Sequence, residues 1–375
     1  MTKTEKLLRD LIALPSVNPA FLPDNEARTG ERRVADFLAA AARPAGLDFE
    51  FQTVFPERAN LLARLSPRHK ARRRILLAPH LDTVNAAKEQ FVPRTQHGRL
   101  YGRGACDTKG SVAAMFTAVC ELARSGQRPA ETEIVFAGLV DEENGQSGSR
   151  VLAASGLKAD LAIVGEPTGL RVVTAHKGDL WLRLETRGKS AHGARPELGR
   201  NAVHAMARIV ELLETEYAAR LRHRRHVLLG HPTVNVGVIS GGTQANIVPD
   251  SCAILVDRRT LPGETERVVR NEIAQLLRKN RLLARMVNGK LGACLPLETD
   301  PQTPLVAQFM RSLGQRRPAG VDFFCDASVL AHGGITSVVF GPGDIAQAHT
   351  SDEWVSLAQL ERARALLTRF LSSLP

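Results

Sequence analysis

The sequence has few of the side chains that stack on nucleic-acid bases: two tryptophans and two tyrosines occur among 375 residues. Aromatic platforms for single-stranded DNA or RNA are therefore scarce. No apolar run approaches the roughly 20 residues that a membrane-spanning helix needs. The first ten residues are largely polar and lack the apolar segment of a secretory signal, so we expect a cytoplasmic protein.

Paired cysteines are also missing. The five cysteines never form a Cys-x-x-Cys pair, and their number is odd. This pattern argues against a disulfide framework and against a thiolate zinc site. We expect reduced thiols at all five positions: Cys106, Cys120, Cys252, Cys294 and Cys325.

Acidic residues are outnumbered, which leaves a formal net charge of +11 with basic clusters at residues 68–74, 220–225 and 278–281. A basic field can bind nucleic acid or draw in carboxylate-bearing substrates. No recognised nucleic-acid module accompanies the clusters, so solvated surface is the better interpretation. Salt-sensitive binding to duplex or single-stranded DNA would support the nucleic-acid alternative.

Length and pattern predict an α/β protein with two cores, because 375 residues exceed one ordinary domain. Residues 1–178 alternate buried-strand runs with amphipathic helices, and the same character resumes over residues 298–375. Between them, residues 179–297 follow the order β-α-β-β-α-β, which is typical of a small ferredoxin-like sandwich. The last strand of this inserted domain is predicted at residues 290–295.

The buried run at residues 134–140 ends abruptly in three adjacent acids, Asp141, Glu142 and Glu143. Three carboxylates in a partly dry crevice repel one another unless a cation lies among them, and a metal ion fits this need best. Alternate residues of an extended chain point to opposite sides, so one glutamate could bind metal while its neighbour transfers protons. For this run alone, a solvated acidic turn is the simpler alternative.

Two further buried runs end in candidate ligands. Residues 75–78 lead to His80, and Asp82 lies on the same side of an extended chain, where its carboxylate can orient the imidazole. Residues 161–164 lead to Glu166. Because ligands of open α/β sheets bind beyond the carboxyl ends of the strands, we expect these side chains to converge.

A glycine-rich loop at residues 101–110 supplies Asp107 and leads into a predicted helix. Such a loop can cradle a phosphate, but this one lacks the Gly-Lys-Ser/Thr ending of a P-loop and the spacing of a dinucleotide fingerprint. The carboxylate of Asp107 would also repel phosphate. We expect the loop instead to add Asp107 to the side chains that converge beyond the strands.

These segments together resemble the M20 family of dinuclear zinc amidohydrolases. The likeness covers nearly the whole chain and rests on an ordered set of motifs: His-x-Asp, Gly-x-x-Asp-x-Lys-Gly, Asp-Glu-Glu, Gly-Glu-Pro-Thr and a late histidine. It implies a zinc-exopeptidase-like sheet with helices on both faces. It also implies that the inserted domain serves as a lid and a dimerisation surface.

The resemblance implies two Zn²⁺ ions per subunit, for which Co²⁺ can substitute, held by histidine and carboxylate ligands. One carboxylate would bridge the two ions. The implied ligands are Asp107 as the bridge, His80 and Glu166 for one ion, and Glu143 and His349 for the other.

Further roles follow from the same resemblance. Asp82 would support His80, and the peptide bond between Asp107 and Thr108 would be cis. Glu142 would be the general base that takes a proton from the metal-bridging water and returns one to the leaving amine.

In the inserted domain, the resemblance implies a homodimer. His192, in Gly-Lys-Ser-Ala-His, would reach the active site of the partner subunit and stabilise the oxyanion. Asn246 and Arg258 match positions that hold the carboxylate of the substrate, a task that suits the planar fork of arginine.

Within the family, residues 171–178 and 341–349 are most similar to the acetylornithine deacetylases. This implies a hydrolase that removes an N-acyl group, most simply acetyl, from an amino acid such as N-acetylornithine. Around Asp326 the chain reads Cys-Asp-Ala where those enzymes have Cys-Thr-Glu-Ala, so a contact of Asp326 with a substrate amine stays open. The alternatives are a succinyl-diaminopimelate desuccinylase, a dipeptidase or carboxypeptidase, and a non-catalytic binding protein on the same fold.

Overall fold

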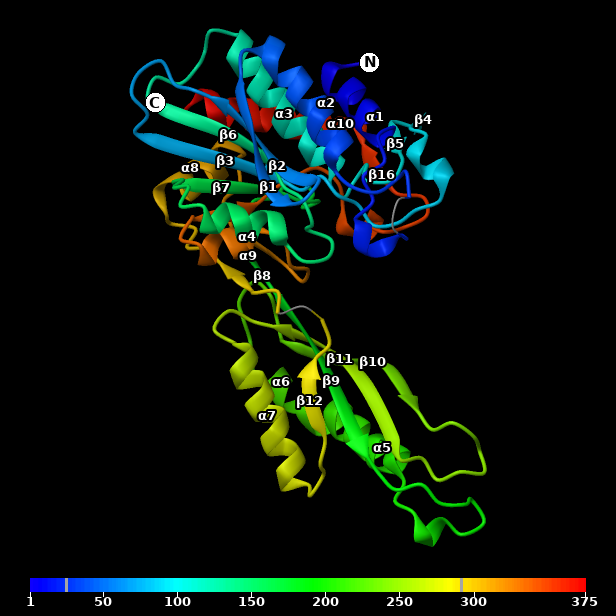
Figure 1. Ribbon diagram of the computed structural model, residues 1–375. Helices are drawn as coiled ribbons and strands as arrows, with labels where there is room; N and C mark the ends of the chain where they lie inside the picture. The colour runs from blue at the N-terminus through cyan, green and yellow to red at the C-terminus, as the bar shows by residue number, and fades with distance from the viewer. Residues whose placement is uncertain (24–25, 291–292) are drawn as a thin grey trace. The chain divides into compact units, whose positions relative to one another are not determined.

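The computed structural model describes residues 1–23, 26–290 and 293–375, and its contacts divide the chain into two compact units (Figure 1). The first unit is formed by three segments, Met1–Thr174, Thr299–Ala319 and Cys325–Pro375. The second unit is formed by Ala175–Glu298 and Gly320–Phe324. The boundaries fall close to those expected from the sequence, but the second unit also takes in a short segment near residue 322.

The larger sheet has nine strands in the main order β1-β2-β6-β3-β7-β15-β8-β13, and β14 pairs with β8. Its outer part, β1 with β2 and β2 with β6, is antiparallel. The strand bounds are β1 (Asp48–Phe55), β2 (Arg58–Leu65), β3 (Arg73–Pro79), β6 (Thr132–Gly138), β7 (Leu161–Gly165), β8 (Val173–His176), β13 (Leu297–Glu298), β14 (Ala319–Val321) and β15 (Ser337–Val339).

Strands β6, β3, β7 and β15 lie next to one another and run parallel. Their apolar residues are buried on both faces, as continuous runs such as Ile134–Ala137 and Leu161–Val164 predict. Since parallel strands end at the same edge, the residues that follow them come together there.

Helices cover both faces of this sheet. On one face, α1, α2, α3, α8 and α10 share an apolar core with alternate strand residues such as Ile75 and Leu77. On the other face, α4 packs on α9, and α9 contacts β7 and β15. The helix bounds are α1 (Lys3–Ile12), α2 (Arg32–Ala42), α3 (Lys109–Arg124), α4 (Ser147–Ala154), α8 (Pro304–Ser312), α9 (Ala327–His332) and α10 (Leu357–Ser372).

A small three-stranded sheet completes the first unit. It has the order β16-β5-β4, with β4 at Arg94–Gln96, β5 at Arg99–Tyr101 and β16 at Trp354–Ser356. β5 and β16 pair antiparallel, so the loop that leaves β5 and the loop that enters β16 lie at the same end of the pair.

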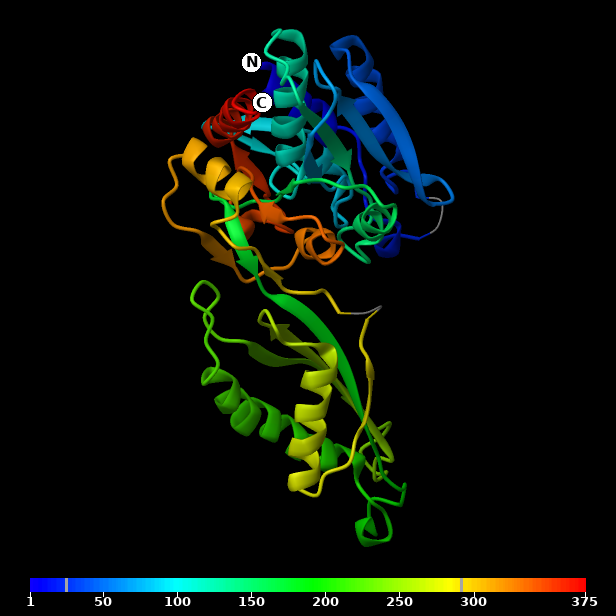
Figure 2. The same cartoon turned by 90° about the vertical axis from the view of Figure 1, so that its left-hand side faces the viewer.

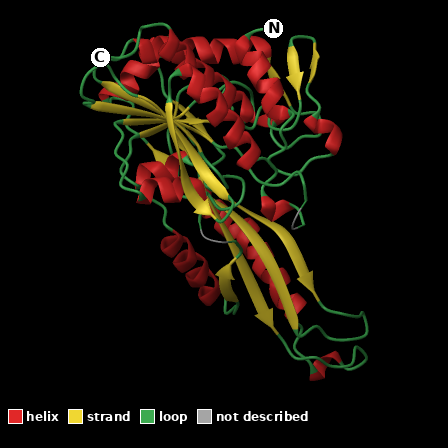
Figure 3. Ribbon diagram, turned by 45° about the horizontal axis from the view of Figure 1, so that its top comes forward, coloured by secondary structure: helices red, strands yellow, loops and turns green. Residues whose placement is uncertain are grey.

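The second unit contains an antiparallel four-stranded sheet in the order β10-β11-β9-β12. Figures 2 and 3 show α5 and α7 beside this sheet, and their apolar faces share a core with alternate residues of β9 and β11. A π-helical segment, Leu213–Tyr217, joins α5 to α6. The bounds are β9 (Gly178–Arg187), α5 (Ala202–Leu212), α6 (Ala218–Arg222), β10 (Thr233–Gly241), β11 (Ser251–Thr260), α7 (Glu266–Lys279) and β12 (Arg285–Asn288).

The predicted β-α-β-β-α-β order is present in this unit, but its last strand lies earlier in the chain than predicted. β12 occupies Arg285–Asn288 instead of residues 290–295. Of the predicted segment, residues 291 and 292 lie outside the described residues, and Cys294 forms an isolated bridge with Asp179. This bridge consists of two backbone hydrogen bonds of 2.8 Å, and β13 begins at Leu297.

None of the helices in the described ranges combines the length and apolarity needed to cross a bilayer. Four cysteines are buried free thiols, as predicted from their spacing: Cys106, Cys120, Cys252 and Cys325.

Candidate metal centre

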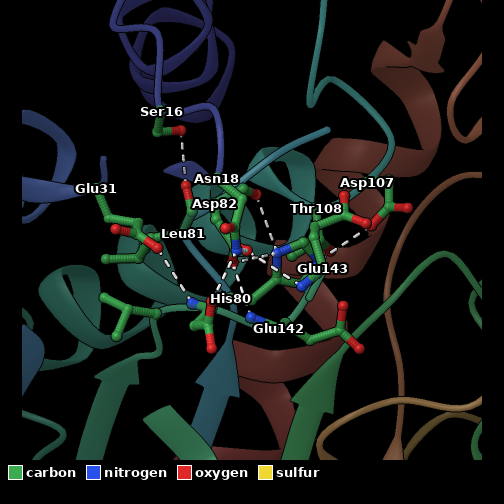
Figure 4. Close-up of polar contacts among 12 residues, drawn as sticks. Ser16, Asn18, Glu31, His80, Leu81, Asp82, Asp107, Thr108, Glu142 and Glu143 are labelled. Atoms are coloured by element: carbon green, nitrogen blue, oxygen red, sulfur yellow. Dashed lines mark hydrogen bonds and ion pairs between the residues drawn. The ribbon is translucent and has the colours of Figure 1, made fainter. Parts of the chain in front are cut away.

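The side chains predicted to converge do so at the carboxyl edge of the parallel strands. His80 follows β3, the pair Glu142 and Glu143 comes after β6, and Glu166 follows β7. The loop between β5 and α3 adds Asp107 (Figure 4). The polar residues that follow these buried strands therefore lie close together at one edge of the sheet.

The carboxylate of Asp107 lies between two histidines. Its Oδ1 is 3.0 Å from Nε2 of His80, and its Oδ2 is 3.3 Å from Nε2 of His349. Two oxygens of one carboxylate that face different imidazoles suit a ligand shared by two cations. The peptide bond that follows, between Asp107 and Thr108, is cis, as the resemblance implied.

A further carboxylate accompanies each histidine. Oε1 of Glu166 is 3.8 Å from Nε2 of His80, and Oε2 of Glu143 is 3.1 Å from Nε2 of His349. Ligand atoms on a tetrahedral Zn²⁺ with bonds of about 2.0–2.2 Å lie about 3.3–3.6 Å apart, and the observed spacings bracket this range.

Two more observations fit a cation. His80, Asp107 and Glu143 offer ligand atoms that all lie within 4.8 Å of one another. Oε1 of Glu143 is buried and has no hydrogen-bond partner among the described residues. Buried polar atoms are seldom left unpaired, so this oxygen is suited to a metal bond.

The electrostatics of the cluster point the same way. Burial raises the pKa of Glu142 well above its ordinary value, and the charges of Glu166 and Asp326 raise it further. Burial and then the charge of Asp107 raise the pKa of Glu143 to about 7. Hydrogen bonds to Asp107 and Glu143 raise the pKa of His349 to about 10. The cluster retains protons that a bound cation would displace.

Asp82 does more than support His80. Nδ1 of His80 is 3.0 Å from the backbone oxygen of Asp82 and 3.4 Å from its carboxylate. That carboxylate also accepts hydrogen bonds from the backbone N–H groups of Glu142 and Glu143, both at 3.1 Å (Figure 4). Asp82 therefore fixes the turn that carries both glutamates.

Asp141, the first acid of the predicted trio, has a different partner set. Its carboxylate accepts hydrogen bonds from Nδ2 of Asn18 at 3.0 Å and from Arg58 at 3.2 Å. Its backbone N–H donates to Glu31, which also pairs with Arg58 at 2.7 Å. The cation beside this acid is thus an arginine from β2, and no local pattern in the sequence predicts this pairing.

Asn18 links this network to the centre. Its side chain donates to Asp82 at 2.8 Å as well as to Asp141. The pair of bonds ties the loop after α1 to the turn after β6. We attribute the left-handed backbone of Asp141, with φ of 68°, to this fixed turn.

The metal-free protein is expected to lose stability as the pH rises. Burial raises the pKa of Glu143 and of Asp326 to about 7, from ordinary values of 4.5 and 3.8. The folded state therefore binds more protons than the unfolded state over this range, and the stabilisation present at low pH is lost as the pH rises through about 7. His349, with a pKa of about 10 against 6.5, acts in the same direction at higher pH.

The test is the melting temperature after chelation, compared between about pH 5.5 and pH 8. We expect the lower value at the higher pH, and a weaker dependence when metal is bound. A melting temperature of the chelated protein that rises with pH would contradict this account of the cluster.

The predicted residues of the second unit form two groups. His192 is exposed and forms a bridge with Ile247, and the backbone N–H of Gly193 donates to the backbone oxygen of Asn246 at 2.7 Å. The structure thus brings His192 and Asn246 side by side, although they lie far apart in the sequence.

Arg258 is not available for a substrate. Its side chain is fully buried on the helix-facing side of β11, where it pairs with Glu264 at 2.8 Å and donates to the hydroxyl of Tyr217 at 3.3 Å. Because strand residues alternate, its neighbour Arg259 faces the opposite side, where it is 30% exposed and pairs with Asp257 at 3.0 Å. The alternation of buried residues along β11 was the signal that could have separated the two arginines.

Asp326 is also buried, with 1% of its surface exposed. Ser149 donates to its Oδ1 at 2.5 Å, and Oδ2 has no hydrogen-bond partner among the described residues. Such burial leaves no surface for a substrate amine, so the structure does not support the predicted contact. Its charge acts instead on Glu142 and Glu166, whose pKa values it raises.

Comparison with known proteins gives matches along the whole chain. A family model described as "Peptidase family M20/M25/M40" matches residues 76–373, a range that includes all five candidate ligands. An acetylornithine deacetylase of Myxococcus xanthus is 34% identical over 351 residues, which cover 89% of this chain and 90% of the relative.

Solved structures share the fold at lower identity. The aminopeptidase PepT of Bacillus cereus ATCC 10987 has a TM-score of 0.80 at 20% identity, and the match covers 99% of this chain and 97% of that one. A dinuclear metal-binding peptidase of the M20 family from Bacillus subtilis has a TM-score of 0.71 at 12% identity, over 98% and 96% of the chains.

Proposed function

Because this chain belongs to peptidase family M20/M25/M40, we propose that it is a metal-dependent hydrolase that removes the acetyl group from an N-acetylated amino acid such as N-acetylornithine. The observation that carries the proposal is the Asp107 carboxylate, with one oxygen facing His80 and the other facing His349. The full-length likeness to an acetylornithine deacetylase supports the choice of substrate class.

The five candidate ligands would hold two divalent ions, by preference Zn²⁺, since imidazole and carboxylate ligands suit that ion. When bound, the ions polarise the carbonyl of the amide and make a water molecule more acidic. The proposed ligands are Asp107 between the ions, His80 and Glu166 on one side, and Glu143 and His349 on the other.

Glu142 is placed to move the proton. Its backbone N–H is held by Asp82, and its carboxylate makes no hydrogen bond to any residue that the structure describes. We assign it the role of general base. It accepts a proton from the attacking water as the carbon–oxygen bond forms, and donates it to the nitrogen as the carbon–nitrogen bond breaks, which releases acetate and the free amine.

We assign oxyanion stabilisation to His192. Nδ1 of this histidine accepts a hydrogen bond from the backbone N–H of Ala194 at 3.1 Å, so in the neutral ring the proton is on Nε2. An N–H directed at the developing negative charge is the group that such a transition state requires. Asn246, beside it, would contact the substrate from the same part of the second unit.

We further propose a homodimer in which His192 of each subunit acts in the active site of the other subunit. β10 is an edge strand of the second unit's sheet, and it exposes Val238 and Ile239 by 52% and 56%. An exposed apolar edge strand is a ready surface for pairing with a second copy. The proposed partners of the chain are thus a small N-acyl amino acid and another copy of itself.

We propose that Arg259, and not the buried Arg258, binds the carboxylate of the substrate. Replacing Arg259 by Met is expected to raise KM about 10- to 100-fold, because a hydrogen-bonded charge pair contributes about 1.5–3 kcal/mol. Replacing Arg258 by Met should instead lower stability, because it removes a fully buried guanidinium that pairs with Glu264 and donates to the hydroxyl of Tyr217. Steady-state kinetics and thermal unfolding of both variants measure the two effects. An unchanged KM in the Arg259 variant would show that Arg259 does not bind the substrate carboxylate.

A substrate panel tests the function itself. After chelation and reloading with Zn²⁺ or Co²⁺, the protein is expected to hydrolyse N-acetylornithine faster than N-succinyl-diaminopimelate or dipeptides, as judged by kcat/KM. Chelation alone should abolish turnover. Failure to hydrolyse any acetylated amino acid would exclude the deacetylase, and preference for another substrate in the panel would identify the desuccinylase or peptidase alternative.

A further inference from the structure

The segments that carry Asp107 and His349 are joined outside the metal centre. Tyr101 at the end of β5 lies opposite Trp354 at the start of β16, and the backbone N–H of Gly102 donates to the backbone oxygen of Glu353 at 3.0 Å. The pairing therefore continues past the strands. It runs the loop that precedes Asp107 alongside the loop that follows His349.

The side chain of Glu353 fastens this contact. It is 1% exposed, and both of its oxygens are used. Oε2 accepts hydrogen bonds from Nη1 of Arg103 at 2.7 Å and from the backbone N–H of Gly104 at 2.9 Å. Oε1 accepts from the backbone N–H of Cys106 at 2.8 Å and of Asp107 at 2.9 Å.

This arrangement uses the full acceptor capacity of a carboxylate, which has about four lone-pair positions. Three of the four donors are backbone groups of the loop that ends at Asp107. The fourth N–H of this stretch, that of Ala105, donates to the backbone oxygen of Gly102 at 3.0 Å. The glutamate thus supplements the loop's own turn and sets the path of the backbone up to the shared ligand.

Arg103 extends the connection to the other loop. Its Nη2 donates to the backbone oxygen of Thr350, the residue after His349, at 3.1 Å. Gln90 donates to the same oxygen at 3.2 Å, and its own backbone oxygen accepts from the N–H of Arg103 at 2.7 Å. Glu353 and Arg103 together fix both loops to one support.

We propose that Glu353 is a positioning residue that holds the Asp107 carboxylate in register with His349, and so sets the affinity of the protein for the cation that these two ligands share. The inference rests on the proposed metal centre. Glu353 is not proposed as a ligand, since both of its oxygens already accept hydrogen bonds from the loop and from Arg103. Its effect reaches the metal only through the backbone of Asp107.

The central variant is Glu353→Gln. Glutamine keeps one acceptor oxygen but turns an NH₂ group towards two of the loop's N–H donors, and it leaves Arg103 without its anion. Titration of the metal-free protein with Co²⁺ alone, followed by visible absorption, is expected to show one of the two ions bound about 10- to 100-fold more weakly, as is usual when a group supporting a ligand is removed. Glu353→Asp, which keeps the charge but is one methylene shorter, should lie between the variant and the parent.

Glu264→Gln is the matched control. Glu264 also pairs with arginine, through Arg258 and Arg224, and its side chain is only 10% exposed, but it belongs to the second unit. Its loss should lower the melting temperature and leave the Co²⁺ affinity unchanged. A Glu353→Gln variant that behaves in the same way, with a lower melting temperature and parental Co²⁺ affinity, would reduce Glu353 to a structural residue and overturn the proposal.

A double variant provides a second test in case the single variant fails to fold. Arg103→Gln with Glu353→Gln removes both charges and avoids an unpaired buried ion. If it folds, as judged by circular dichroism, weaker Co²⁺ binding supports the proposal and parental binding overturns it. The outcome is independent of hydrolysis: a parent protein that binds Co²⁺ but hydrolyses no acetylated substrate would end the proposed function and leave this inference standing.

Discussion

Replacing Glu142 by Gln is expected to lower kcat by about 10²–10⁴-fold, the usual contribution of a general base, while the content of bound metal stays at the parental level. Glutamine has the size of glutamate but cannot accept the proton of the attacking water. The carboxylate of Glu142 makes no hydrogen bond to a described residue, and its backbone N–H is held by Asp82, so the substitution leaves the surrounding contacts intact. Single-turnover kinetics and metal analysis of the same sample provide the measurement.

The neighbouring glutamate is the control. Glu143→Gln removes a group that lies 3.1 Å from His349, and it should lose metal as well as activity. The two variants separate a proton carrier from a ligand within one dipeptide. Loss of metal in the Glu142 variant, or full activity with metal retained, would show that the roles are assigned wrongly.

The second large effect is expected in dimers that combine two different inactive variants. We expect His192→Ala to lower kcat by about 10²–10³-fold, as loss of an oxyanion donor does. If His192 acts on the partner subunit, a dimer of one His192→Ala chain and one Glu142→Gln chain has one intact site, which combines Glu142 of the first chain with His192 of the second. Two variants that are each almost inactive should then regain about half of the parental activity per heterodimer, because a twofold dimer has two equivalent sites.

Co-expression of the two chains with different affinity tags, followed by purification on both tags, isolates the heterodimer for this assay. A heterodimer that stays as inactive as either variant would show that His192 serves its own subunit. Elution of the parent protein as a monomer in size-exclusion chromatography would contradict the dimer itself.

Most of the central sheet could be predicted from the sequence because its strands are continuous apolar runs. Residues 75–78, 134–140 and 161–164 are buried on both faces, and each ends in a polar ligand or a short turn before one. Parallel strands end at the same edge, so the convergence of His80, Glu166 and the glutamate pair followed from pattern alone. His349 and the bridging role of Asp107 needed the motif order, because neither residue follows such a strand directly.

The parts that sequence reasoning missed depend on distant contacts. Arg58 neutralises Asp141 from a strand that lies far away in the chain, and Asn18 contacts both Asp82 and Asp141 from the loop after α1. No spacing rule relates such residues. The prediction that Arg258 binds the substrate was wrong for another reason. Arg258 and Arg259 are adjacent in the same sequence motif, and only the face of β11 on which each lies decides which one is buried.

The position of β15 bears on how the protein is made. In the sheet this strand lies between β7 and β8, yet the ribosome produces it long after both. Until Ser337–Val339 emerges, the growing polypeptide carries β7 with an open hydrogen-bonding edge, while the compact unit encoded in between can already acquire its own core. Such unpaired edges invite association between nascent chains, so protection of β7 during translation is a requirement that this topology places on the cell.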